Sequence, residues 1–311
     1  MKKATMKDIA RQANVSVATV SYVLNNVKNQ TIPDPTRQSI LQIARELNYV
    51  PNLAARSLVK QRTGLVGILI NRTSALPYWK RQNYMSLVES LEAMLTEAGY
   101  HTLLVRLNPL NPAMDVIRER KLDAVFVLDV MDEMFYRISA NFVEGVPLIL
   151  IDSIIDDRLF NQVNYNYPQA LQAAVSSSAA PSCLVMESYY NKALSEWVIA
   201  ESALPQEHIH IVNNSQEAQS ELVSFLALNR DKHVIVINEF LAKAVEKTAL
   251  ASSVTAICTC GVPEILLDST TIIQFQNDRA LTAYELMTSV IREQYDTSLT
   301  GSNQFLVEVL Q

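Results

Sequence analysis

The stretch NVSVATVSYVL, residues 14–24, crowds small and β-branched residues into a segment that otherwise has the pattern of a short helix. Three hydroxyl side chains, Ser16, Thr19 and Ser21, lie on it close to the N-terminus. Hydroxyl groups are common donors to nucleic-acid phosphates, so one interpretation is a helix that approaches a DNA backbone. The other is that the segment only belongs to the first small helical bundle of a larger domain.

The residues before this stretch predict another helix and a tight turn. Thr5 and Asp8 form the capping-box pattern T-x-x-D at the start of a first helix. Residues 14–16 then make a turn in which Ser16 is placed to cap a second helix. The apolar positions of the two helices are Ile9, Ala10, Ala13, Val20, Val23 and Leu24. The turn therefore joins two helices within a few residues.

A third helix and a linker follow. Asp34-Pro35 supplies a cap and a helix-starting proline, and helical spacing continues to Asn48. The apolar positions of this helix are Ile40, Leu41, Ile43, Ala44 and Leu47. Pro51 ends it. The next segment, NLAARSLVKQRTG (52–64), is compatible with a short helix but has no core of its own, which is typical of a hinge.

From Gly64 onward, apolar runs of strand length alternate with helical segments. The runs are GLVGILI (64–70), HTLLVRL (101–107), DAVFVLD (123–129), VPLILID (146–152), SCLVMES (182–188), HIHIVNN (208–214), HVIVINE (233–239), TAICTC (255–260), STTIIQF (269–275) and finally LVEVL (306–310). This alternation predicts parallel sheets with helices on both faces. The first four runs make one α/β half, and the next group makes a second of similar size. We expect a cleft where the carboxyl ends of the two sheets face each other.

The composition is that of a globular protein with two or three domains. The chain has 311 residues, of which 49% are hydrophobic and 19% charged, and it contains only six glycines. No apolar run approaches the roughly 18 residues that span a bilayer, and no signal-peptide core follows MKKATMKD. We therefore expect a cytoplasmic protein without a membrane partner. Three cysteines, an odd number, predict reduced structural thiols.

Charge is divided unevenly along the chain. Residues 1–62 contain ten Lys and Arg and three Asp and Glu, a net charge of +7. Because the whole chain carries −6, the remainder carries −13. A basic head on an acidic body is expected where the head approaches a polyanion and the body does not.

Several long segments occur in the order and spacing of one known family. They are MKDIARQANVSVATVSYVLN (6–25), TRQSILQIARELNYVPNLAARSL (36–58), GLVGILI (64–70), LPYW (76–79), AGYHTLLV (98–105), GVPLILID (145–152) and STTIIQFQNDRALTAYELM (269–287). In these segments the chain resembles the lactose-repressor/galactose-repressor (LacI/GalR) family of bacterial transcription regulators. The resemblance implies a small all-α helix-turn-helix DNA-binding headpiece (1–50) and a hinge helix or linker (51–63). It also implies a two-lobed α/β, periplasmic-binding-protein-like body with parallel sheets (64–311), which binds an effector and dimerises.

The resemblance implies that the second helix lies in the major groove of DNA. The base-reading residues are then Val17, Ala18 and Tyr22, and the phosphate contacts are Thr5, Ser16, Thr19, Ser21 and Asn25. Apolar side chains read thymine methyl groups but cannot make the bidentate contact that Arg makes to guanine. Tyr22 stands where many relatives carry Arg or His, so we expect a different half-site. Plain helix packing is the alternative for Val17 and Ala18.

The resemblance also assigns a role to the linker. Leu58 lies where the family inserts a leucine wedge into the minor groove at the centre of the operator, and Arg56 adds positive charge beside it. Two wedges side by side require two chains, so a homodimer on a pseudopalindromic duplex is expected. Ordinary linker packing is the alternative for Leu58.

An effector site in the cleft is a further implication. Its expected residues are Asn71, Tyr78, Trp79, Asp129, Asn166, Tyr190, Asn238 and Gln274, with a structural role as the alternative for each. The family pattern is altered at Tyr165-Asn166, AAPSC (179–183), YYNKALSEW (189–197) and CGVPE (260–264), where relatives carry charged groups that grip sugars. The cleft keeps the aromatic pair Tyr78-Trp79 but has fewer charged groups than relatives have. This combination predicts a small-molecule effector other than an unmodified hexose, or no effector.

Other classes of function have less support. The sequence contains no G-x-S-x-G motif, no phosphate-binding glycine loop and no metal-ligand spacing, so we predict no enzyme, cofactor or metal. His208 and His210 alternate with Ile as ordinary strand residues. A periplasmic solute-binding protein would share the body but not the basic head. The prediction is an effector-controlled repressor; a regulator that acts without a ligand, or answers to a protein partner, stays open.

Overall fold

The computed structural model describes residues 4–24, 31–49, 62–71, 76–108, 114–142, 145–213, 215, 217–292 and 303–310. The chain divides into two compact units, residues 1–63 and 64–311. Three of the predicted site residues, Asn25, Arg56 and Leu58, lie outside the described residues, as does the predicted hinge helix.

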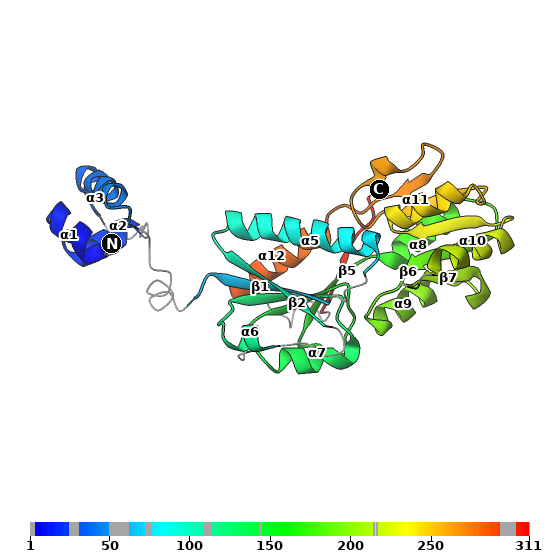
Figure 1. Ribbon diagram of the computed structural model, residues 1–311, viewed down its shortest axis with the longest axis horizontal. Coiled ribbons are helices and arrows are strands. Elements are labelled where there is room, and N and C mark those ends of the chain that lie inside the picture. The colour runs from blue at the N-terminus through cyan, green and yellow to red at the C-terminus, as the bar shows by residue number, and fades with distance from the viewer. Residues whose placement is uncertain are drawn as a thin grey trace. The chain divides into compact units, whose positions relative to one another are not determined.

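The described residues of the first unit form three short helices, which make up the headpiece (Figure 1). They are α1 (Met6–Ala13), α2 (Val17–Leu24) and α3 (Asp34–Glu46). Ile9, Val20 and Ile40, one from each helix, are fully buried and form the centre of its core. Helix α3 begins one residue earlier than predicted, because Pro33 takes the cap position that the sequence pattern gave to Asp34.

The turn between α1 and α2 is fixed by local chemistry. Asn14 adopts a left-handed conformation (φ 51°), which Asn tolerates better than most residues, and its N–H bonds to the carbonyl oxygen of Ala10. Ser16 Oγ then accepts the N–H of Thr19 at 3.0 Å and caps α2 as predicted. At the start of α1, the backbone N–H of Thr5 donates to Asp8 Oδ2 at 2.9 Å.

The second unit consists of two lobes. The strands of lobe 1 are β1 (Leu65–Asn71), β2 (His101–Leu107), β3 (Ala124–Leu128), β4 (Leu148–Ile151), β5 (Asn161–Tyr165) and β11 (Gln304–Val307). They form a parallel sheet in the order β11-β5-β4-β3-β1-β2. Its helices are α5 (Tyr78–Glu97), α6 (Asp115–Arg118), α7 (Asp132–Ser139) and α12 (Arg279–Ile291). Helices α5 and α12 cover one face of the sheet, and α6 and α7 cover the other (Figure 1).

Lobe 2 repeats this design. Its strands are β6 (Ser182–Glu187), β7 (Ile209–Val212), β8 (His233–Ile237), β9 (Val254–Ile257) and β10 (Thr271–Ile273). They pair in parallel in the order β10-β9-β8-β6-β7. Its helices are α8 (Tyr167–Ser176), α9 (Lys192–Ser202), α10 (Ala218–Leu228) and α11 (Glu239–Thr248), with short 3₁₀ turns at Gln206–His208 and Pro263–Ile265. The central strands are buried on both faces, which explains their continuous apolar runs.

Two strands of lobe 1 show how the chain crosses between the lobes. Strand β5, NQVNY, is too polar to be recognised as an apolar run, and β11 returns from the C-terminal end of the chain to pair with it. The crossing segments are bonded to one another: Asn166 N–H to Val307 O at 2.9 Å and Gln276 N–H to Glu308 O at 2.8 Å. A hinge of adjacent strands therefore joins the lobes.

The observed architecture confirms the predicted fold class for the described residues. Within those residues no helix is both long and apolar enough to cross a bilayer. The three cysteines are buried and form no disulfide. Burial raises the pKa of Cys183 to about 11 and also raises the pKa values of Cys258 and Cys260.

Candidate functional site

Helix α2 presents its predicted base-reading residues to solvent. Val17 is 41% exposed and Tyr22 is 36% exposed, and Ala18 is exposed between them. Val20 and Val23, three residues apart on the opposite side, are buried in the headpiece core. The outer face of α2 is thus available for contact, and its role in base reading remains a prediction.

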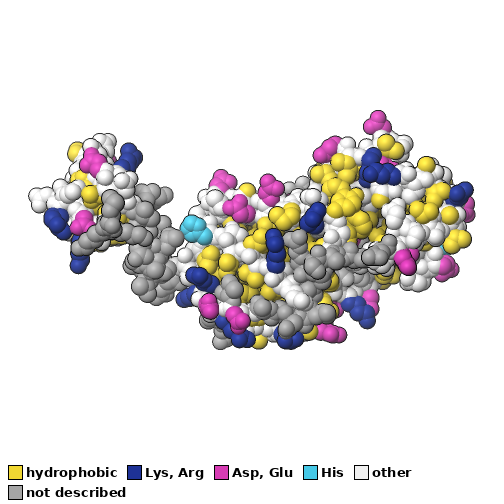
Figure 2. Space-filling model, viewed as in Figure 1, with side chains coloured by type: hydrophobic (Ala, Val, Ile, Leu, Met, Phe, Trp, Pro, Cys, Tyr) yellow, Lys and Arg dark blue, Asp and Glu magenta, His cyan; other side chains and the backbone are white. Residues whose placement is uncertain are grey.

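The predicted phosphate contacts lie around this face. Thr5 and Ser16 are exposed, Thr19 and Ser21 are partly exposed, and the hydroxyls of Ser16 and Thr19 lie 2.9 Å apart. Figure 2 shows Lys and Arg side chains on the surface of the headpiece. Among the described residues of the first unit, the exposed Lys and Arg are Lys7, Arg11, Arg45 and Arg62. The headpiece surface therefore combines hydroxyl donors with positive charge.

The second region of interest is the interlobe cleft, where the carboxyl ends of the two sheets meet. Three residues that directly follow strands, Asp129, Asp152 and Asn238, adopt positive φ values of 45°, 53° and 92°. Such conformations are costly for residues other than glycine and tend to gather at functional sites. Both Asp129 and Asp152 are buried, as is Glu187 at the end of β6. Buried acids at this position require partners.

Lys80, on the first turn of α5, is the partner of Asp129. The two side chains, both almost completely buried, are joined by a 2.5 Å contact between Lys80 Nζ and Asp129 Oδ2. Tyr84 donates its hydroxyl to the same Asp129 oxygen at 2.6 Å. Burial alone would lower the pKa of Lys80, but the carboxylates of Asp129 and Glu187 outweigh it, and the pKa is raised.

Asp129 also receives donors from lobe 2. Its Oδ1 accepts the backbone N–H groups of Tyr190 and Asn191 at 2.7 and 3.0 Å. Lys80 in turn donates to the carbonyl oxygen of Ser188 at 2.7 Å. Each lobe therefore both gives and receives hydrogen bonds at this point, which fastens the lobes together.

Glu187 is the least satisfied acid in the cleft. Its Oε1 accepts a long hydrogen bond of 3.3 Å from Asn238 Nδ2, and its Oε2 is buried without a hydrogen-bond partner. Burial raises the pKa of Glu187 to about 7, although the charge of Lys80 and the Asn238 bond act in the opposite direction. Glu187 therefore holds a proton well above the pH at which an exposed glutamate ionises.

This shift predicts a pH dependence of stability. Between the ordinary glutamate pKa of 4.5 and the raised value of about 7, native Glu187 binds a proton that the unfolded chain has released. The free energy of unfolding must then fall as pH rises through this interval, by up to about 1.4 kcal/mol per pH unit, and level off above it. In Glu187→Gln this contribution is removed. Urea unfolding at pH 5, 6, 7 and 8 should show a shallower fall for Glu187→Gln than for the wild type.

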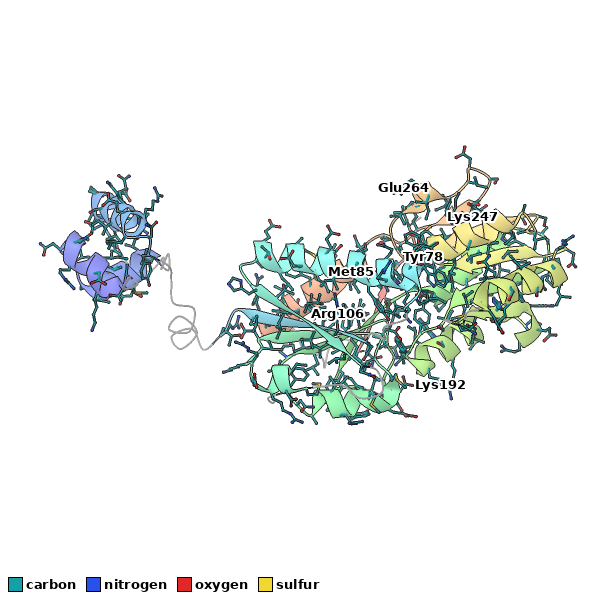
Figure 3. The ribbon with its side chains drawn as sticks, viewed as in Figure 1. Tyr78, Met85, Arg106, Lys192, Lys247 and Glu264 are labelled. Carbon is teal, nitrogen blue, oxygen red and sulfur yellow. The ribbon has the colours of Figure 1, made fainter. Side chains whose placement is uncertain are left out.

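Glu264→Gln is the matched control for this measurement. Glu264 belongs to lobe 2 and is exposed at the surface, as Figure 3 shows. Its replacement should leave the pH profile parallel to that of the wild type. Parallel profiles for Glu187→Gln and the wild type would contradict the raised pKa.

A second buried ion pair lies in lobe 1 beside the hinge. Arg279, the first residue of α12, is 2% exposed and forms an ion pair with Asp152. It also donates to Asn83 Oδ1 at 2.7 Å and to the carbonyl oxygen of Thr259 in lobe 2 at 3.3 Å. Its guanidinium lies 4.4 Å from the centre of the Tyr165 ring. Burial raises the pKa of Asp152, and the charge of Arg279 opposes that shift.

A cavity of about 320 Å³ lies next to this pair. Its walls come from α5, from the loop after β9 and from the crossing segment before α12. The lining includes Asn83, Tyr165, Cys260, Gln274, Phe275 and Arg279, with the rings of Tyr165 and Phe275 stacked 3.9 Å apart. Amide, carbonyl and aromatic groups thus surround a space large enough for a small polar molecule.

The eight predicted effector residues are not all gathered in one place. Gln274 alone among them lines the cavity, while Asp129 and Tyr190 contact Lys80. Tyr78 lies at the N-terminal end of α5 (Figure 3) and packs edge-on against Trp79 and against Phe240 of lobe 2. Effector contact remains a prediction for all eight.

Three amides in this set have partners within the chain. Asn71 donates to the carbonyl oxygens of Leu128 and Asp129. Asn166 and Asn238 cap α8 and α11, and each also donates to a glutamate, Glu308 and Glu187 respectively.

The sequence analysis did not predict the residues that form the buried contacts of the cleft. They are Lys80, Tyr84, Glu187, Tyr189 and Arg279. Two signals were available. A lysine in the first turn of a helix opposes the helix dipole, so Lys80 breaks a local rule directly after the Tyr78-Trp79 pair. Glu187, at the carboxyl end of an otherwise apolar strand, is a second such signal.

The sequence and fold can be compared with known proteins. The sequence model of the family described as "Bacterial regulatory proteins, lacI family" matches residues 5–52. The HTH-type transcriptional regulator RegA of Clostridium acetobutylicum is 30% identical over 183 residues, which cover 56% of this chain and 51% of that protein. The match thus spans about half the length of this relative. Catabolite control protein A of Staphylococcus epidermidis is 26% identical and covers 96% of this chain and 90% of its own.

The fold is shared with solved structures. A lac repressor dimer bound to operator and the anti-inducer ONPF superposes with a TM-score of 0.71 at 16% identity, covering 99% of this chain and 97% of its own. A ribose-bound LacI family regulator from Enterococcus faecium gives a TM-score of 0.59 at 13% identity over 79% of this chain and 96% of its own. The matched headpiece, the relatives and the shared architecture agree. Residues 5–52 thus match the lacI family of bacterial regulatory proteins, and the chain as a whole is similar to regulators of that family and shares the fold of the lac repressor.

Proposed function

We propose that the protein is a homodimeric transcriptional regulator, a repressor, that binds a pseudopalindromic DNA operator through its headpiece. The observation that carries this proposal is the outer face of α2, on which Val17, Ala18 and Tyr22 are exposed while the hydroxyls of Ser16 and Thr19 flank them. A helix of this kind reads base edges with a few central side chains and holds the backbone with the flanking ones. Residues 1–50 form the DNA-binding domain in this proposal, residues 51–63 the hinge and residues 64–311 the body.

The first candidate for control of this regulator is a small effector. The cavity of about 320 Å³ supports it, because pockets for small ligands begin at roughly 300 Å³ and combine apolar walls with a few convergent polar groups. Closure of the lobes around an effector would change the geometry of the body and, by linkage, the operator affinity.

The second candidate is a body whose lobes stay closed without an effector. The buried contacts of Lys80 favour it, since a side chain of the protein itself fills the place where the carboxyl ends of the strands meet. DNA binding is common to both candidates.

A half-site library tests the roles assigned on α2. Tyr22→Ala should change which base is preferred at one position by about 1–3 kcal/mol, because a base contact is lost. Thr19→Ala should weaken binding to all sequences about equally, since a phosphate contact carries no sequence information. Affinities for a set of duplexes that vary one half-site base at a time, measured by fluorescence anisotropy, separate the two effects.

The matched control is Tyr136→Ala, which removes an exposed tyrosine from the body. It should leave every affinity in the library unchanged. If Tyr22→Ala, like Thr19→Ala, lowers the affinity for every duplex in the library equally, Tyr22 is not a base-reading residue.

A further inference from the structure

Lys80 is the one buried lysine among the residues that the structure describes. It stands in the first turn of α5, where the positive end of the helix dipole disfavours a cation. A buried ammonium group is tolerated only where its charge and its N–H donors are matched. The surroundings of Lys80 Nζ must therefore compensate for both burial and position.

These surroundings form a shell around the ammonium group. Asp129 Oδ2 and the carbonyl oxygen of Ser188 accept from Nζ at 2.5 and 2.7 Å. The rings of Tyr190, Tyr189 and Tyr84 have their centres 4.6, 5.6 and 5.7 Å from the same nitrogen. We call these five residues the ammonium cage: Tyr84, Asp129, Ser188, Tyr189 and Tyr190. Carboxylate, carbonyl and aromatic faces are the groups that bind ligand ammonium ions in proteins.

The cage is assembled from both lobes. Tyr84 and Asp129 belong to lobe 1, whereas Ser188, Tyr189 and Tyr190 follow β6 in lobe 2. Lys80 contacts both sets, 49 residues before Asp129 and 108 before Ser188 in the chain. Anything that fills the cage therefore bridges the lobes, as a ligand between two closing lobes does.

We propose that the interlobe cleft contains a binding site for a primary ammonium group and that Lys80 occupies it as an intramolecular ligand. Lys80 thereby holds the lobes together without a small molecule. A competing ligand for this site would be a primary amine in its cationic form. The binding site stands on the contacts alone; only its consequence for operator affinity rests on the proposed function.

Chemical rescue of the full-length chain tests the site. Lys80→Ala removes three carbons and the ammonium group, a fragment equivalent to n-propylammonium. We expect the Tm of Lys80→Ala to lie on the order of 10 °C below that of the wild type, because Asp129 loses its buried counter-ion. n-Propylammonium chloride should raise the Tm of this variant by about 3–6 °C at ten times its Kd.

Controls separate occupation of the cage from general effects of salt or solvent. Sodium chloride at equal concentration and 1-propanol, the neutral analogue, should give no such rise in Lys80→Ala. n-Propylammonium should not raise the Tm of the wild type or of Lys192→Ala, which lacks an exposed lysine on α9. If n-propylammonium stabilises Lys80→Ala no more than sodium chloride does, or stabilises the wild type equally, the proposal is overturned.

Lys80→Met provides a second route if Lys80→Ala does not fold. Methionine fills the space of the lysine stem without the charge, so this variant should have a lower Tm and a larger radius of gyration in solution scattering than the wild type. A wild-type Tm together with an unchanged radius would overturn the proposal.

The last arm measures operator affinity of Lys80→Ala with and without n-propylammonium. A change in affinity links the cage to regulation. Rescue of the Tm with no operator binding by either protein would leave the ammonium site standing and remove the proposed DNA-binding function, so the two failures are distinguishable.

Discussion

A chain truncated to residues 64–311 is expected to lose operator binding completely, whereas the full chain binds with an affinity that falls steeply as salt rises. The net charge of residues 1–62 is +7 and that of the remainder is −13, so the truncated protein has lost the region that neutralises phosphate. Each neutralised phosphate adds about −0.9 to the slope of log K against log salt. A headpiece that makes six to ten such contacts loses roughly 10³- to 10⁵-fold in affinity between 50 and 200 mM salt.

Fluorescence anisotropy with a labelled operator at several salt concentrations measures both effects. Circular dichroism and sedimentation of the truncated chain provide the control, because residues 64–311 form a compact unit and should remain a folded dimer. Specific operator binding by the truncated chain, or a flat salt dependence of the full chain, would refute the assignment of DNA binding to the headpiece.

The second large effect is expected at Arg279. Arg279→Met should lower the free energy of unfolding by about 3–5 kcal/mol, since it leaves Asp152 buried without a counter-ion. In a body of this size the loss corresponds to a decrease in Tm of about 6–20 °C. Urea unfolding of the full chain measures it.

A double variant identifies the cause. Asn tolerates the positive φ of Asp152 and removes the charge, so Arg279→Met with Asp152→Asn should be more stable than Arg279→Met alone. Arg106→Met is the matched control, because it removes an exposed arginine from β2 (Figure 3), and it should change stability by less than about 0.5 kcal/mol. If Arg279→Met lowers the free energy of unfolding no more than Arg106→Met does, the ion pair is not what stabilises this region. The same conclusion follows if the double variant is no more stable than Arg279→Met alone.

Local chemistry in the sequence is sufficient to predict the elements of the fold. Ser16 occupies the N-cap position of α2, and Asn14 tolerates the left-handed conformation of the turn before it. The continuous apolar runs correspond to strands that are buried on both faces. Strand β5 was not predicted because its polar residues Gln162 and Asn164 are buried rather than exposed. Their side chains are hydrogen-bonded to the backbone of Ile155 and Ser153, respectively. Polar strands in a parallel sheet are thus recognisable only when their hydrogen-bond partners are known.

The interlobe site was less accessible from sequence because its contacts are distant along the chain. Tyr190 and Asp129 lie at the carboxyl ends of strands, which is why both could be predicted for the cleft. Lys80 could not be assigned to them, since nothing local indicates that a lysine on α5 reaches the backbone of Ser188. Arg279 is similar, because its partner Asp152 precedes it by 127 residues.

The pairing of β11 with β5 also determines the order in which the body can be completed during synthesis. Lobe 2 is an uninterrupted insertion between β5 and α12, so all of its strands leave the ribosome together and before the end of the chain. Lobe 1 still lacks α12 and its edge strand at that moment, and the unpaired edge of β5 is open to other chains. A premature stop after β10 and before residue 304 would therefore leave lobe 2 intact and lobe 1 prone to aggregation, although most of lobe 1 is translated first.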